Sequence, residues 1–205
     1  MKIAIIGAGH VGSALAKGWA KAGHRIYIGA RDLSADKIQS LEKSHDHISA
    51  HTISEAAEAA EVILVATPPQ AVIALAGQLG DVTEKVIIDA TNALFVKPEP
   101  YSNASEALRK LTLSRHVVKC FNSTGFENMQ DPIYNGQGID MFMAGNSPRG
   151  KEKTAQLARD LGFAECYDFG GDDQIPLLEQ FAMAWINLAI MQKQGRNLAF
   201  KMLRR

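Results

Sequence analysis

The chain has 205 residues, of which 46% are hydrophobic and 21% charged, and its 22 basic residues balance its 22 acidic residues. This length predicts one globular domain, or one domain and a small addition, around a substantial core. The zero net charge gives no electrostatic reason to expect nucleic acid or an anionic lipid surface as a partner. The most apolar stretch, residues 181–191, is too short to cross a bilayer, so we expect no membrane segment and a cytoplasmic protein.

The amino terminus predicts a turn that holds a pyrophosphate. A near-continuous apolar strand, residues 3–6, runs directly into a Gly-x-Gly-x-x-Gly sequence, and a helical pattern follows. Gly7 permits the tight turn, Gly9 lets the backbone approach phosphates, and Gly12 lets the helix pack on the strand. The free N–H groups at the start of the helix would face the negative charge. The predicted contacts come from the glycines together with Ala8, His10 and Val11.

The second strand, residues 25–28, decides which dinucleotide we expect. A preference for NAD(H) usually places a carboxylate at the end of this strand, whereas a 2′-phosphate needs a cation. Here Gly29 and Ala30 are small and uncharged, and Arg31 follows. A guanidinium grips phosphate with two hydrogen bonds, and Lys37 would add a second charge, so we predict NADP(H). Asp32 is expected to start the next helix instead of binding ribose.

Apolar strands and helical segments then alternate, which predicts a parallel sheet. The expected strands are residues 48–52, 61–66, 85–89 and 116–121, and the expected helices are 55–60, 71–79 and 106–111, the last capped by Ser102. Ligands of such sheets gather at the carboxyl ends of the strands. The candidate residues there are Ala66, Thr67, Pro68, Thr91, Asn92 and Asn122. Each residue type is also common in ordinary turns, which is the alternative explanation.

Residues 122–138 are rich in Asn, Gly and Pro and predict a long functional loop. A strand at 141–144, a helix at 148–161 and a strand at 164–168 follow. The predicted fold is therefore α/β, a Rossmann-type doubly wound, mostly parallel sheet with helices on both faces. We expect residues 1–170 to form this NADP-binding domain.

The remaining residues, 171–205, predict a small helical extension over the cofactor cleft or at a dimer interface. One final helix is expected over residues 176–203, and its first half is apolar on nearly every side. Such a helix must be covered all round, which favours packing against a second subunit in a twofold homodimer. Burial within one chain is the alternative.

The sequence shows no constellation typical of acid-base, nucleophilic or metal chemistry. The six histidines form no metal-ligand or triad pattern, so no metal is expected, and paired carboxylates at a plausible site are absent. Cys120 and Cys166 lie in apolar surroundings and are expected to be buried thiols. Hydride transfer between two stacked planar rings depends mainly on positioning and needs no such group. Asn122 is the best candidate for orienting the reacting groups.

Several segments resemble one known family, the NADPH-dependent coenzyme F420 reductases and the related short bacterial oxidoreductases. They are residues 7–12, 28–31, 65–68, 119–128 and 141–145, together with the apolar last helix. The resemblance covers nearly the whole chain and places Arg31 where the family binds the 2′-phosphate. It implies NADP(H) as cofactor, an F420-like deazaflavin or a flavin as acceptor, a small lobe over the nicotinamide, and a dimer.

The loop at residues 122–127 departs from the F420-using pattern, so other acceptors and functions stay open. A ferric chelate, or a small carbonyl or imine substrate, would suit the same architecture. The related hydroxyacid dehydrogenases and pyrroline-carboxylate reductases carry a longer helical domain than the predicted last helix provides. A non-catalytic NADP(H)-binding redox sensor or interaction protein is the alternative of another class.

Overall fold

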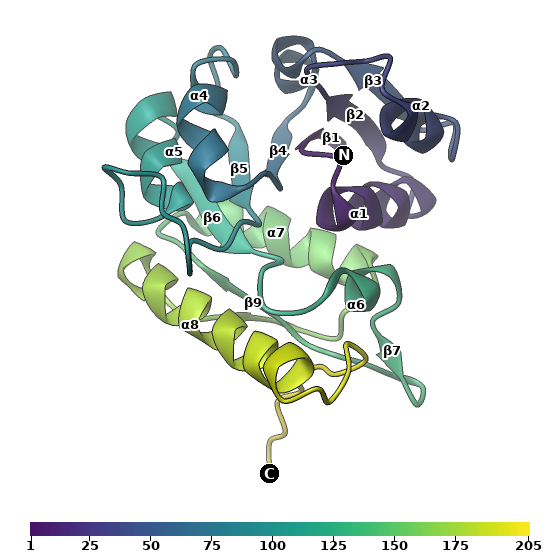
Figure 1. The fold of residues 1–205 in the computed structure, drawn as a ribbon, viewed down its shortest axis with the longest axis vertical. Coiled ribbons are helices and arrows are strands. Elements are labelled where there is room, and N and C mark those ends of the chain that lie inside the picture. The colour runs from purple at the N-terminus through teal and green to yellow at the C-terminus, as the bar shows by residue number, and fades with distance from the viewer.

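The computed structural model describes residues 1–205 as an α/β fold around one eight-stranded sheet (Figure 1). The strand order is β10-β9-β6-β5-β4-β1-β2-β3, and the first six strands in the chain run parallel. β9 is antiparallel to β6, and β10 pairs with β9 in parallel. The predicted doubly wound, mostly parallel sheet is therefore confirmed. The strands are β1 (Lys2–Ile6), β2 (Arg25–Gly29), β3 (Ile48–His51), β4 (Val62–Val65), β5 (Val86–Asp89), β6 (His116–Cys120), β9 (Met141–Ala144) and β10 (Cys166–Asp168).

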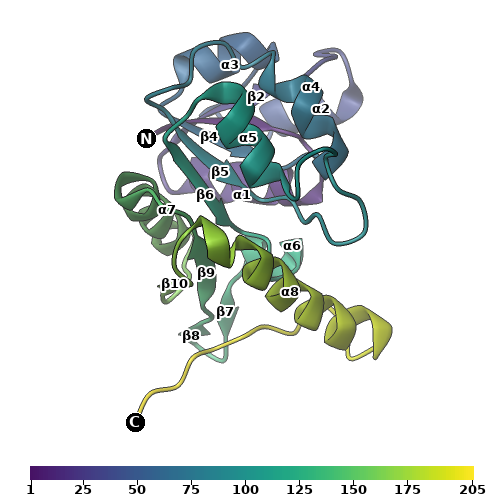
Figure 2. The same ribbon diagram turned by 90° about the vertical axis from the view of Figure 1, so that its left-hand side faces the viewer.

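Helices cover both faces of this sheet. One apolar core joins it to α1, α2 and α7, and a second joins it to α3, α4 and α5. Figure 2 shows α8 lying across β9 below these layers, where a third cluster packs Ile175 and Leu178 against Phe142. The helices are α1 (His10–Lys21), α2 (Asp36–Glu42), α3 (Ile53–Ala59), α4 (Val72–Ala76), α5 (Ala104–Thr112), α6 (Phe126–Gln130), α7 (Pro148–Asp160) and α8 (Ile175–Ile186).

The strand sequences explain this layering. β1, β4 and β5 are almost continuously apolar, as expected of parallel strands buried on both faces, and successive side chains enter the two cores alternately. The order reverses between β1 and β4, since the chain builds outward from β1 to β3 on one side and from β4 onward on the other. Ligands of open α/β sheets bind at such a reversal, outside the carboxyl ends of the strands.

Three local expectations were wrong. Residues 122–138 are not one irregular loop, because they contain α6 and a small hairpin of β7 (Ile133–Tyr134) and β8 (Gln137–Gly138). Asp32 does not start α2, which begins at Asp36; its carboxylate instead accepts hydrogen bonds from the backbone and hydroxyl of Ser34. Asn103, and not Ser102, caps α5 by accepting a hydrogen bond from the Glu106 N–H.

The last helix is shorter than predicted. α8 ends at Ile186 and is followed by one π-helical turn, Asn187–Met191. Lys193 and Gly195 then have left-handed backbones, with φ of 56° and 91°, which ends the helix. The rest of the tail runs extended along the β7–β8 hairpin, where Phe200 accepts a hydrogen bond from the Asp140 N–H and Met202 donates one to the Asp140 carboxylate. None of the helices has the length and apolarity needed to cross a membrane.

Candidate active site

The glycine turn between β1 and α1 is built as its sequence predicts. Gly7 has a φ of 108°, and a Cβ there would lie 2.6 Å from the carbonyl oxygen of Ala66. A Cβ on Gly12 would lie 1.9 Å from the carbonyl oxygen of Gly7. A Cβ on Gly9 would meet nothing within 4 Å, because this residue faces open space. The turn therefore packs tightly on its protein side and leaves its backbone bare on the other.

A cleft of about 700 Å³ opens at this turn, at the reversal of strand order. It is lined by Gly7, Ala8 and Gly9 from the turn and by Ala66, Thr67 and Pro68 after β4. The same cleft extends past the end of β2 to Arg31 and Lys37. The structure thus brings eight of the predicted cofactor-binding residues together around one elongated cavity.

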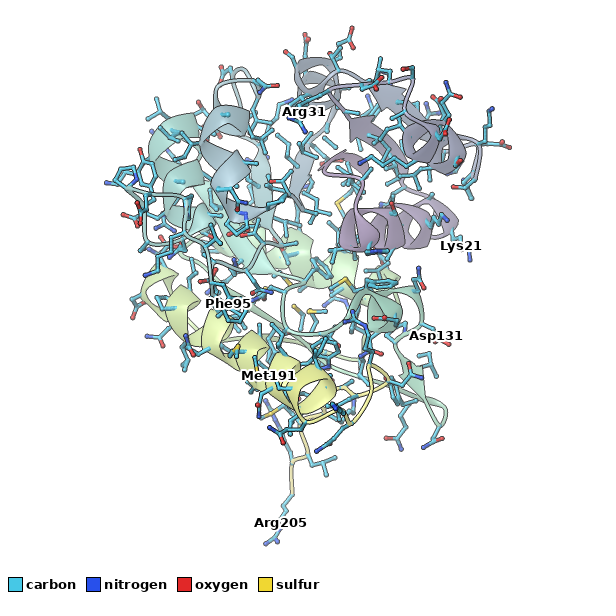
Figure 3. All side chains as sticks on the ribbon, viewed as in Figure 1. Lys21, Arg31, Phe95, Asp131, Met191 and Arg205 are labelled. Atoms are coloured by element: carbon cyan, nitrogen blue, oxygen red, sulfur yellow. The ribbon has the colours of Figure 1, made fainter.

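The end of the cleft at β2 is positively charged and open to solvent. Arg31 and Lys37 are both exposed, and neither forms an ion pair. Figure 3 shows Arg31 at the rim between the β1–β3 part of the molecule and α4. Gly29 lies behind it, and a Cβ there would lie 2.4 Å from the end of the Ile6 side chain, which would have to shift. Two free cations beside a cleft of small residues suit a phosphate monoester.

Thr67 lies where the cleft passes from the glycine turn to β4. Its methyl group would be 3.1 Å from a Cβ on Gly7, so the two residues are in close contact. Its hydroxyl is buried and has no hydrogen-bond partner in the protein. Buried hydroxyls are normally paired, and an unpaired one at the wall of a cleft is a candidate partner for a ligand.

The predicted residues after β5 and β6 form one hydrogen-bonded unit. Asn122 donates to the Asn92 side-chain oxygen and Asn92 donates back to the Asn122 carbonyl, each at 3.0 Å. The side-chain oxygen of Asn122 is buried and unpaired. Thr91 is held through its N–H, which donates to Asp89 at 2.9 Å. This unit holds an unused acceptor at the carboxyl end of β6, two strands beyond β4 and Thr67.

Six predicted residues lie outside the lining of the main cleft: His10, Val11, Gly12, Thr91, Asn92 and Asn122. The exposed His10 ring stacks on Phe126 of α6, with centroids 4.6 Å apart and planes inclined by 18°. Arg196 from the tail lies over the Phe126 and Trp185 rings and pairs with Glu127. His10 therefore belongs to an aromatic wall shared by α1, α6, α8 and the tail.

The sequence analysis missed a buried cluster of two carboxylates and one ammonium. Asp89 at the end of β5 and Glu179 of α8 converge on the fully buried ammonium of Lys119, at 3.1 and 2.7 Å. Asp89 and Glu179 are 30 and 60 positions from Lys119 in the chain, so no local pattern connects the three residues. The sequence gives only a weak indication of this cluster. Each of the three residues is a charged residue within an apolar run, and a charge that becomes buried needs a partner.

This cluster joins α8 to the segment after β5. Glu179 accepts a hydrogen bond from the Ala93 N–H at 3.2 Å as well as from Lys119. Asp89 accepts from Ser105 at 2.6 Å and from the Thr91 N–H. Burial alone would raise the pKa of the Asp89 carboxyl, but the Lys119 charge and these hydrogen bonds outweigh it and leave the pKa lowered. Asp89 is therefore a carboxylate at neutral pH.

The whole arrangement suits a phosphorylated dinucleotide. The glycine turn offers bare backbone and a helix N-terminus to a pyrophosphate. Arg31 and Lys37 lie at the end where a ribose 2′-phosphate would lie, and the Asn92–Asn122 unit follows β5 and β6, the next strands beyond β4. No nucleophile with an adjacent base occupies the cavity, so positioning is the chemistry that the site supports.

Known proteins resemble this chain over part or most of its length. Residues 2–93 match the family described as NADP oxidoreductase coenzyme F420-dependent. The predicted resemblance is confirmed. An F420-dependent NADP reductase of Methanothermobacter marburgensis is 28% identical over 94% of each chain, and one from Methanothermobacter thermautotrophicus is 27% identical over 94% of this chain and 91% of its own.

Solved structures agree with this family. A structure from Arthrobacter sp. FB24, provisionally named an F420-dependent NADP-reductase, covers both chains fully with 26% identity and a TM-score of 0.86. A pyrroline-5-carboxylate reductase from Coxiella burnetii shares only the fold, at 17% identity and a TM-score of 0.68, and this chain covers 68% of it. The predictions of an NADP-dependent oxidoreductase and of NADP(H) as its cofactor are confirmed by these comparisons.

Proposed function

We propose that this protein transfers a hydride between NADP(H) and an F420-like deazaflavin. The observation that carries the proposal is the elongated cleft at the strand-order reversal, which joins a bare glycine turn to two unpaired cations. The acceptor follows from the relatives, two of which are named F420-dependent NADP reductases and cover 94% of this chain. A flavin is the nearest chemical alternative, since its ring system has the same planar shape.

In this proposal the chain binds and orients the reactants and contributes no acid or base. The turn at residues 7–12 holds the pyrophosphate, and Arg31 and Lys37 hold the 2′-phosphate. Thr67 and Asn122 offer buried, unused polar atoms to the nicotinamide half, together with Thr91 and Asn92. The bound dinucleotide supplies the transferable hydride. The protein fixes the two rings face to face and excludes water from between them.

We further propose that two parts of the chain have different roles. Residues 1–170 bind the cofactor, and residues 171–205 cover its nicotinamide end and form the interface of a homodimer in the cytoplasm. The support is a set of exposed apolar side chains on α8, on the turn after it and on the segment after β5: Leu177, Ile190, Met191, Phe95 and Val96. Exposed large apolar side chains are typical of a surface that another subunit covers.

The test is NADPH oxidation by the purified protein with F420, FMN, FAD, a ferric chelate, and a small imine or ketone as separate acceptors. We expect turnover with F420 and at most slow turnover with the others. Tight NADPH binding without turnover of any acceptor would favour the redox-sensor alternative. If the protein turns over only the imine or the ketone, its acceptor is a small imine or carbonyl compound and not a deazaflavin.

Arg31→Ala tests the nucleotide assignment separately. It should weaken NADPH binding by about 1–3 kcal/mol, as for a lost charge-assisted contact, and leave NADH binding almost unchanged. Arg115→Ala is the matched control, because Arg115 is also an exposed arginine but precedes β6, at the amino-terminal ends of the parallel strands, whereas the cleft lies at their carboxyl ends. Equal losses for both nucleotides in Arg31→Ala would refute its assignment to the 2′-phosphate.

A further inference from the structure

The Asp89–Lys119–Glu179 cluster carries an unbalanced charge. Two carboxylates face one ammonium, and neither carboxylate pairs with any other cation. Lys119 and Asp89 are fully buried, and the Glu179 side chain is 8% exposed. The cluster therefore encloses one net negative charge within the protein. An uncompensated buried charge lowers the stability of the fold, so a further positive partner would be favoured beside this cluster.

Every hydrogen bond of the cluster is donated to one of the two carboxyl groups. Glu179 Oε1 accepts from the Lys119 ammonium and from the Ala93 N–H, and both of these groups can only donate. Asp89 accepts from Ser105, Lys119 and the Thr91 N–H. These contacts suit two carboxylates around one ammonium, which together carry one net negative charge.

The cluster lies at the nicotinamide end of the proposed cofactor site. The cleft crosses the carboxyl ends of β2, β1 and β4, and β5 and β6 are the next two strands beyond it. Neighbouring strands are about 5 Å apart, so Asp89 and Lys119 lie one and two spacings past Thr67. Thr91 and Ala93, which the cluster holds through their N–H groups, flank Asn92. A buried charge at this range acts through protein and is weakly screened by salt.

We propose that this buried negative charge favours the positively charged, oxidised nicotinamide over the neutral, reduced one. Hydride donation removes two electrons and one proton from the dihydronicotinamide and leaves its ring with one positive charge. The planar acceptor gains the hydride, and the proton that completes its reduction comes from water. The cluster stabilises the cationic product of this step and lowers the reduction potential of the bound couple. The inference rests on the proposed function, since it needs NADP(H) in the cleft.

Glu179→Gln is the principal test, because glutamine keeps the size of the side chain and an oxygen for Lys119 and Ala93. Removing the charge should raise the ratio of the dissociation constants of NADP⁺ and NADPH by on the order of tenfold, because the charge acts through the protein interior, where charges interact more strongly than in water. A tenfold change in this ratio corresponds to a rise of about 30 mV in the potential of the bound two-electron couple. The increase should persist at high salt.

Asp89→Asn should shift the ratio in the same direction from the other carboxylate, and it serves if Glu179→Gln does not fold. Glu84→Gln is the matched control, because it makes the same charge change at an exposed residue before β5. A purely structural role would weaken both nucleotides alike and leave the ratio unchanged, which would overturn the inference. If the wild type binds neither nucleotide, the proposed function itself fails, and the two failures are thereby distinguished.

Discussion

A Cβ on Gly12 would lie 1.9 Å from the carbonyl oxygen of Gly7, whereas a Cβ on Gly9 would meet nothing within 4 Å. The three glycines of this motif therefore have two different roles. Gly7 and Gly12 allow the turn to pack on itself, and Gly9 keeps the wall of the cleft open. Substitution should separate these roles.

Gly12→Ala should destabilise the fold, by about 1–3 kcal/mol or more, because the new methyl group must push the Gly7 backbone aside. Gly9→Ala should leave the melting temperature nearly unchanged, since its backbone, with φ of −78° and ψ of −167°, is open to alanine. The same change should weaken NADPH binding, because the methyl group projects toward the pyrophosphate. Thermal melts and nucleotide titrations of both variants check this contrast. A cold-sensitive or unfolded Gly9→Ala with a normal Gly12→Ala would reverse the two roles.

Lys85 caps the end of α3. Its ammonium donates to the carbonyl oxygens of Ala57, Glu58 and Ala60, at 2.6, 2.6 and 2.8 Å. These carbonyls have lost their helical partners, and a cation at a helix C-terminus also opposes the helix dipole. Lys85→Met should therefore lower the free energy of unfolding by about 1–2 kcal/mol. Lys110→Met, at an exposed lysine of α5, should change it little in the same denaturant titration.

The sequence predicted what neighbouring residues determine. The strand, glycine turn, helix and strand of residues 2–29 follow from spacing alone, because the apolar periods and the glycines fall within one short segment and Gly12 is required by its contact with Gly7 in the same motif. The end of the last helix was mispredicted at residue 203, because the apolar residues of the tail continue to look helical. Leu198 accepts a hydrogen bond from Asn128, which lies 70 positions away, and only the folded chain brings the two together.

The site divides in the same way. Arg31 and the glycines were predicted because a known spacing relates them to one strand and one helix. Lys119, Asp89 and Glu179 were missed as a group because α8 must first pack across β9 before Glu179 can reach Lys119. The stacking of His10 on Phe126 was not foreseen, since it depends on where α6 lies, and the contact of His10 with the cofactor stays a prediction.

His24 should make stability depend on pH. Its side chain is 7% exposed, and its ring bonds Asp160 at 2.9 Å. Burial is the main reason that its pKa is lowered below the usual 6.5. A lowered pKa in the folded state means that the neutral ring stabilises the fold above the unfolded pKa and that this contribution is lost as the pH falls through the folded pKa.

The melting temperature should therefore fall as the pH is lowered from about 7 to about 5. His24→Gln, which keeps a hydrogen-bonding side chain without a titratable ring, should flatten this dependence. His47→Gln, at an exposed histidine, should leave the profile like that of the wild type. If the melting temperature falls equally with pH in His24→Gln and in the wild type, groups other than His24 cause the dependence.

The two cysteines should behave differently although their sulfur atoms are 4.0 Å apart. Cys120 lies on β6 and Cys166 on β10, with β9 between them, so their backbones are about two strand spacings apart and too distant for an unstrained disulfide. Burial raises the pKa of the Cys120 thiol well above its usual value, and the neighbouring Cys166 sulfur raises it further. Because the thiolate is the reactive form, iodoacetamide at about pH 8 should spare Cys120 in the native protein and modify it only after unfolding.

Mass spectrometry of the alkylated peptides measures this directly, with Cys166, which is partly exposed, as the internal comparison. Rapid labelling of Cys120 in the native protein would show that β6 and β10 move apart far more readily than their packing implies. A disulfide formed by mild oxidation without loss of structure would show that the two strands move together just as readily.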